Sequence, residues 1–171
     1  MKTTADIFND FAGNSRTWVY QASRNLTDAE AEELKALARS FTAEWKSHGS
    51  QLKAEADVLY NRFLVMMVDE DAGSASGCSI DSSVAQIRSI EQKLNIDLFD
   101  RLNLAYLNES GELETVHANK IAQAFDLGVI NENTTVFNNM VTSKSELESN
   151  WKIALKDSWA YSRCSSNTAS V

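Results

Sequence analysis

Six consecutive apolar residues, from Phe63 to Val68, restrict the possible folds of this chain more than any other segment does. The run is far too short to cross a bilayer as a helix, and an uninterrupted apolar pattern is typical of a central strand. Between Leu52 and Tyr60, apolar and charged residues alternate, as they do in a half-exposed strand. Asn61 separates the two runs and favours a hairpin turn. We therefore expect an antiparallel sheet with the apolar run as its central strand.

A first helix is predicted between Thr27 and Gly49. Thr27 and Glu30 have the spacing of a capping box, in which the two residues satisfy each other's backbone N–H groups. Gly49 is expected to end the helix, with Lys46 and His48 in the last turn, where the helix dipole favours positive charge. The apolar residues in between recur at steps of three and four and share one face: Leu34, Leu37, Ala38, Phe41 and Trp45.

A second helix is predicted after the small-residue loop Gly73–Ser83, and Ser79 or Asp81 is expected to cap it. Its apolar stripe consists of Val84, Ile87, Ile90 and Leu94. With further strands over 17–21 and 102–107, the order is strand, helix, strand, strand, helix, strand. This order is typical of the split βαβ arrangement of ferredoxin-like α+β folds, in which helices pack on one face of an antiparallel sheet. Residues 1–100 are thus expected to form a ferredoxin-like domain that shares its last strand, 102–107, with the next part.

A small α+β extension is expected over residues 101–161. After strand 102–107, the pattern predicts a hairpin turn at 109–111, a strand over 112–116, a helix over 118–127 and a strand over 134–137. Gly128 is the expected stop of the helix. Ser143 and Glu146 have the spacing of a second capping box. The polar residues 162–171 are expected to form a frayed tail.

The composition excludes several classes of protein. A formal net charge of −8, a pI of about 4.8 and the lack of a dense Lys/Arg cluster argue against nucleic-acid binding. The N-terminal residues contain no apolar signal core, and no run is long enough for membrane insertion. The two cysteines, Cys78 and Cys164, are too few for a disulfide framework. We therefore expect a cytoplasmic protein with reduced thiols, while its oligomeric state stays open.

The loop Gly73–Ser83 is the candidate functional site, because free amides at the start of a helix favour an anion or a thiolate. Cys78 is the candidate nucleophile, with His48 or Asp81 as its neighbours. The candidate ligand-binding residues are Gly77, Ser79, Ser82 and Arg101. Simpler interpretations exist for three of these residues. Cys78 can be a small buried residue in a tight turn, His48 can stabilise a helix end, and Arg101 can form a surface ion pair.

The acidic stretch Asp69–Asp71, together with Asp81, could ligate a hard cation. Its spacing differs from that of a calcium loop, because Ile80 occupies the twelfth position, where such a loop has glutamate. A solvated strand end is the simpler interpretation. The histidines and cysteines also lack the spacing of a zinc site. We expect no metal and no cofactor.

The chain contains a set of segments that recur together: Arg16–Gln21, Trp45–Gly49, Ser76–Ser83, Asp97–Leu102, Val136–Asn139 and Lys156–Trp159. As a set they resemble a family of short bacterial proteins that commonly carry the label "ABC transporter ATPase" and whose activity is not established. The resemblance extends from about Ile7 to Trp159, which is nearly the whole chain.

The label implies nucleotide binding, but the residues do not support ATP hydrolysis. A phosphate-binding loop of that class has the pattern Gly-x-x-x-x-Gly-Lys-Ser/Thr. Here Gly73 and Gly77 are one residue too close, and Cys78 stands in the place of the lysine that reaches the terminal phosphates. We therefore expect no ABC-type ATPase activity.

A second resemblance lies in the C-terminal part. Residues 121–137, with a helix followed by Gly128-Val-Ile130 and Val136-Phe137, are similar to the second half of GYF-type modules. The resemblance implies binding of proline-rich peptides, although the Gly-Pro step of those modules is missing.

These observations favour a binding or accessory protein that recognises a peptide or protein partner. The alternative is a thiol-dependent enzyme that uses Cys78 at a helix N-terminus. Nucleotide binding, as the family label implies, is a more distant alternative.

Overall fold

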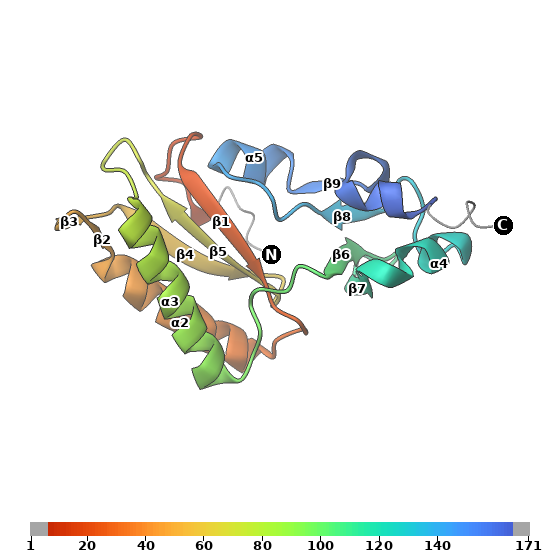
Figure 1. Ribbon diagram of the computed structural model, residues 1–171, viewed down its shortest axis with the longest axis horizontal. Coiled ribbons are helices and arrows are strands. Elements are labelled where there is room, and N and C mark those ends of the chain that lie inside the picture. Colours follow the sequence, from red (N-terminus) through yellow and green to blue (C-terminus); the bar gives the residue numbers. More distant parts are fainter. Residues whose placement is uncertain (1–6, 166–171) are drawn as a thin grey trace. The chain divides into compact units, whose positions relative to one another are not determined.

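The computed structural model describes residues 7–165, which form two compact units. The first unit comprises Met1–Asp100 and Asn139–Ser149, and the second comprises Arg101–Asn138 and Asn150–Val171. Each unit combines an antiparallel sheet with helices (Figure 1). The predicted α+β class is confirmed.

The first unit is built on a three-stranded antiparallel sheet in the order β1-β5-β4. β1 spans Arg16–Gln21, β4 spans Ala54–Leu59 and β5 spans Phe63–Val68, so the apolar run forms the central strand as predicted. Tyr60 and Asn61 form the hairpin turn with φ angles of 55° and 47°, the positive values that a type I′ turn requires. All residues of β5 are at most 1% exposed. Since their side chains alternate between the two faces, burial is not confined to the face that the helices cover.

Helix α2 (Asp28–Glu44) begins as predicted. The Glu30 N–H donates to Thr27 Oγ1 at 3.2 Å, and the Thr27 N–H donates to Glu30 Oε2 at 2.8 Å. The predicted capping box is therefore confirmed. Arg24 adds a bidentate ion pair to the same carboxylate, with distances of 2.9 Å and 2.7 Å. This ion pair fixes the chain that enters the helix.

The expected end of this helix at Gly49 is wrong. The backbone of Trp45 is extended (φ −70°, ψ 123°), and the residues after it form a short ribbon of β2 (Lys46–Ser47) and β3 (Ser50–Gln51). His48 (φ 51°) and Gly49 (φ 81°) form the turn of this ribbon. Lys46 and His48 thus lie outside the helix and do not stabilise its last turn.

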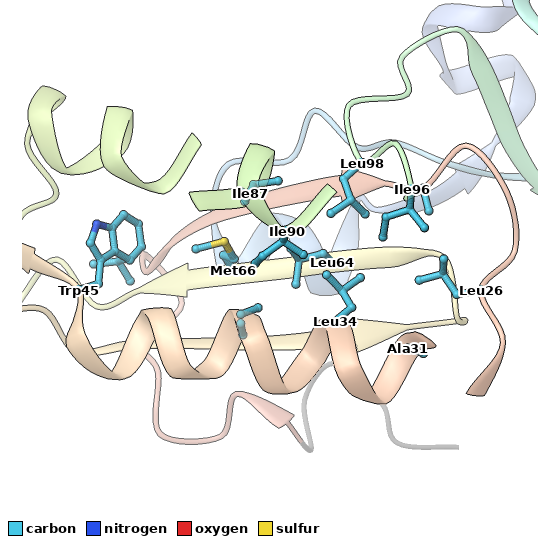
Figure 2. Packing of buried hydrophobic residues seen from close by; sticks show 14 of the residues in the cluster. Leu26, Ala31, Leu34, Trp45, Leu64, Met66, Ile87, Ile90, Ile96 and Leu98 are labelled. Atoms are coloured by element: carbon cyan, nitrogen blue, oxygen red, sulfur yellow. The ribbon is translucent and has the colours of Figure 1, made fainter. Parts of the chain in front are cut away.

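Helix α3 (Gly77–Leu94) packs beside α2 on one face of the sheet. Figure 2 shows Leu34 of α2 and Ile87 and Ile90 of α3 directed toward Leu64 and Met66 of β5. Most residues of the predicted apolar stripes belong to this core, but the half-buried Val84 does not, and Trp45 enters it from the position just after α2. The partly buried side chains of Leu37 and Phe41 pack at its margin.

The predicted fourth strand forms but does not join this sheet. It is β6 (Asn103–Leu107), which belongs to the sheet of the second unit. Beside β1, an irregular segment over 139–144 runs antiparallel instead. The Thr17 N–H donates to Thr142 O at 3.0 Å, and the Lys144 N–H donates to Ser15 O at 2.9 Å. Helix α5 (Lys144–Ser149) continues this segment within the first unit.

The second unit contains a four-stranded antiparallel sheet in the order β7-β6-β8-β9. Strands β7 (Leu113–His117), β8 (Thr135–Phe137) and β9 (Lys152–Ala154) join β6. The remaining elements are the α-helix α4 (Ile121–Asp126) and the 3₁₀ helices η1 (Ala118–Lys120), η2 (Leu155–Asp157) and η3 (Trp159–Arg163).

Gly128, with a φ of 71°, follows α4 as the predicted stop. The frayed tail is wrong for its described part, because η3 extends to Arg163 and Cys164 is buried in the core of this unit. Burial raises the pKa of the Cys164 thiol. Residues 166–171 of the expected tail lie outside the described residues.

Candidate functional site

The candidate loop leads into the N-terminus of α3, as predicted, but the capping residue is Ser76. Ser76 is extended (φ −79°, ψ 166°), and its Oγ accepts the Ser79 N–H at 3.2 Å. The expected caps, Ser79 and Asp81, both lie inside the helix. Gly77 and Cys78 are consequently the first two helical residues, where backbone N–H groups have no partner within the helix.

Cys78 is exposed and reduced. The interpretation of Cys78 as a small buried residue in a tight turn is therefore wrong. Gly77, just before it, is also exposed, with open space where a Cβ would stand. A ligand can thus approach the backbone at the start of α3.

The β2–β3 ribbon lies against this end of α3. Ser47 Oγ accepts the Ser76 N–H at 3.2 Å, and the buried Trp45 donates from Nε1 to Ser79 O at 2.9 Å. These two bonds bring the ribbon turn, which carries His48, to the corner of the first unit that carries Cys78. Both residues are exposed. Within residues 7–165 no hydrogen bond joins His48 to Cys78 or Asp81, so the structure shows no assembled catalytic pair.

The serines of the site serve the helix itself. Ser79 is buried and its Oγ donates to Ser76 O, while the exposed Ser82 donates from Oγ to Ser79 O, both at 2.8 Å. Asp81 is exposed one residue before Ser82. Arg101 is also exposed but belongs to the second unit. Among the candidate ligand-binding residues, Gly77, Ser79 and Ser82 therefore lie in the first two turns of α3, and Arg101 lies outside this helix.

Neighbouring side chains contact all three residues of the acidic stretch Asp69–Asp71, and two of these contacts are ion pairs. Lys53 Nζ lies 3.0 Å from Asp69 Oδ2, Arg16 lies 3.7 Å from Glu70, and Asn14 donates to Asp71. The hydrogen bond from Lys53 lowers the pKa of the Asp69 carboxyl. Nowhere in the described part of the chain do three or more His, Cys, Asp or Glu side chains form a group that could hold a metal ion.

The second unit exposes large apolar side chains that were not among the candidate site residues. Leu127 is 72% exposed, Val129 is 55% exposed, and Trp159 and Tyr161 are 39% and 36% exposed. Tyr161 packs edge-on against Phe125, with ring centroids 6.5 Å apart. This contact places η3 beside the end of α4. The sequence signal for this surface is the pair of apolar residues that flank Gly128. Gly128 is an exposed helix stop, and both neighbours are exposed with it.

Two polar contacts hold the aromatic residues of η3. The guanidinium of Arg163 lies over the Trp159 ring, with its Cζ 5.5 Å from the ring centroid. The Tyr161 hydroxyl donates to Glu132 Oε1, and this hydrogen bond raises the pKa of the Tyr161 phenol. The rings are thus held in place while part of their surface stays open to solvent.

Comparisons of the chain with protein-family models, curated proteins and solved structures find no match. In residues 7–165, no helix has the length and apolar character needed to cross a membrane. Function is therefore inferred from the residues described above.

Proposed function

We propose that this chain is a cytoplasmic binding module that recognises a peptide or protein partner through the exposed apolar residues of its second unit. These residues are Leu127, Val129, Trp159 and Tyr161. Their exposure carries the proposal, because large apolar side chains gathered at a surface are typical of interaction sites. Trp and Tyr are also enriched where proteins meet, since each combines a large apolar body with a polar group.

The resemblance to GYF-type modules supports the same surface. It covers residues 121–137, which include both Leu127 and Val129. The ligand that it implies is a proline-rich peptide, whose extended conformation is largely formed before binding and therefore loses little entropy. Trp159 and Tyr161 supply the aromatic faces on which proline rings pack in such complexes.

An NMR titration of the full chain with a proline-rich decapeptide tests the proposal. We expect chemical-shift changes at the Leu127 and Val129 amides and at the Trp159 indole. Leu127→Ser should weaken binding about ten-fold, as expected for an apolar contact at the centre of an interface. Met140→Ser is the matched control, because Met140 is 74% exposed but belongs to the first unit. Shifts confined to other residues, or equal weakening by Met140→Ser, would contradict the proposal.

The exposure of Cys78 favours a second candidate function, thiol chemistry at the start of α3. A thiolate at a helix N-terminus is stabilised by the free amides and the dipole. Iodoacetamide labelling below neutral pH should then modify Cys78 faster in the folded protein than in the unfolded chain. The buried Cys164 provides the internal control. If His48 acts as a neighbouring base, His48→Ala should slow the labelling. Equal rates in the folded and unfolded chain would exclude an activated thiol.

A further inference from the structure

Three strand edges in the described residues are closed or short. On β4, the outward peptide groups of Ala56 are taken by side chains, since Arg39 Nε donates to Ala56 O at 2.9 Å and Glu55 accepts the Ala56 N–H. On β1, the segment 139–144 covers the edge through the hydrogen bonds to Ser15 and Thr17. β9 is only three residues long. Such devices prevent the pairing of free edges with other chains.

The edge of β7 has no such protection. The Asn108 N–H donates to Glu112 O and the Ala118 N–H donates to Leu102 O, which fixes the alternation of hydrogen-bonded pairs along β6 and β7. By this alternation, the N–H and C=O groups of Leu113, Thr115 and His117 point away from β6. Among residues 7–165, the N–H groups of all three residues and the C=O groups of Leu113 and Thr115 have no hydrogen-bond partner. The C=O of His117, which is the N-cap of η1, accepts the first hydrogen bond of that helix. β7 therefore offers a regular row of donors and acceptors to an added strand.

The two ends of this edge carry opposite charge. The hairpin turn before β7 carries the exposed Glu109 and Glu112, and the exposed Lys120 follows the strand at its other end. Neither Glu109 nor Lys120 forms an ion pair within the described residues. In an antiparallel pair centred on Thr115, the two Thr115 residues exchange both hydrogen bonds. Leu113 of one copy lies opposite His117 of the other, so that the His117 N–H donates to the partner's Leu113 O. The acidic end of each copy then meets the basic end of its partner.

We propose that the β7 edge is an interface between two copies of this chain, which pair antiparallel about Thr115 and join their sheets. A strand edge that matches itself in this way gives a closed two-fold dimer, the commonest form of protein assembly. The inference goes beyond the proposed function and does not depend on it, because the apolar residues of the second unit play no part in the pairing.

Sedimentation of the full chain over a range of concentrations tests this dimer against the 19.0 kDa monomer. Thr115→Pro removes the outward N–H of each copy and leaves the β6–β7 ladder intact, since proline is tolerated on edge strands when its nitrogen faces solvent. Loss of two hydrogen bonds per dimer should raise the dissociation constant about thirty-fold. Thr115→Ala is the matched control, because it removes the same side chain but retains the N–H, and it should dimerise as the wild type does.

Charge reversal provides a second measurement that does not alter the strand. Glu112→Lys should weaken the dimer about five-fold, because two like-charged pairs replace two opposite-charged ones. Adding Lys120→Glu to the same chain should restore it. Circular dichroism confirms that each variant is folded. A wild-type chain that stays monomeric at several hundred micromolar, or a folded Thr115→Pro variant that dimerises normally, would overturn the proposal.

Discussion

Replacing Trp45 by phenylalanine tests whether one indole connects the β2–β3 ribbon to the candidate site. Trp45 is 2% exposed, and its Nε1–H donates to Ser79 O at 2.9 Å in the first turn of α3. Its ring also packs on Phe41 and Trp18, with centroid distances of 5.2 Å and 5.8 Å. A phenylalanine ring keeps the apolar contacts but loses the hydrogen bond and part of the volume.

The expected loss in the free energy of unfolding has two parts. A lost hydrogen bond costs about 1 kcal/mol. The smaller ring leaves a gap of roughly 40 Å³, which at roughly 24 cal/mol per Å³ adds about 1 kcal/mol. Together, Trp45→Phe should cost about 2 kcal/mol.

Urea unfolding followed by far-UV circular dichroism measures this change as a lower midpoint with an unchanged slope. Trp18→Phe is the control, because Trp18 is half-buried and its indole donates no hydrogen bond within the described residues. Trp18→Phe should lower the free energy of unfolding clearly less than Trp45→Phe does. A loss below about 0.5 kcal/mol for Trp45→Phe, or equal losses for both variants, would refute the reasoning, because the hydrogen bond and burial would then make no difference.

Three further predictions concern other parts of the chain. Hydrogen bonds from Arg24 and from the Thr27 backbone lower the pKa of Glu30 from 4.5 to about 2, so its stabilising charge is present above pH 4.5 and is lost as the pH falls toward 2. Glu30→Gln should therefore be less stable than the wild type at neutral pH, and the difference in the free energy of unfolding should disappear between pH 4.5 and 2. A difference that stays constant over this range would show that the charge of Glu30 does not stabilise the fold. Leu147→Ala should lower the free energy of unfolding by about 2–4 kcal/mol, because Leu147 of α5 is 2% exposed. An unchanged urea midpoint would show instead that α5 contributes little to the stability of the first unit. Purified protein with ATP and magnesium should release phosphate no faster than the background, since the loop lacks the lysine, and turnover that is lost on substituting the loop would contradict this.

Much of the first unit could be predicted from short-range patterns. The continuous apolar run of β5, the capping box of α2 and the apolar stripes of both helices each depend on neighbours within a few residues. Such patterns report burial and hydrogen bonding that are settled locally. The end of α2, in contrast, depends on a contact with a distant part of the chain. Lys46, His48 and Gly49 match a helix C-terminus, but the burial of Trp45 against Ser79 of α3 holds the backbone extended there.

In the candidate site, too, some features depend on neighbouring residues and others on tertiary contacts. The position of Cys78 at the start of α3 followed from the small residues before it. Its exposure did not, because a loop of glycine, serine and alanine is equally compatible with a tight buried turn. The choice among Ser76, Ser79 and Asp81 as the cap also depended on tertiary contacts, since the Ser76 N–H is held by Ser47 of a distant ribbon.

The fourth strand marks the limit of sequence patterns. A period of two predicts that 103–107 is a strand, but it does not say which sheet the strand joins. Residues 139–144 pair with Ser15 and Thr17 beside β1, although their sequence, in which only Met140 and Val141 are apolar, has no alternating strand pattern. The Gln21 end of the β1 edge pairs with Phe99 and Asp100, but its Ser15–Thr17 end is covered by a segment far along the sequence. The first unit is therefore completed only once most of the chain is available. For this reason Leu147, in the helix that continues the segment, should matter to the stability of a unit that otherwise ends at Asp100.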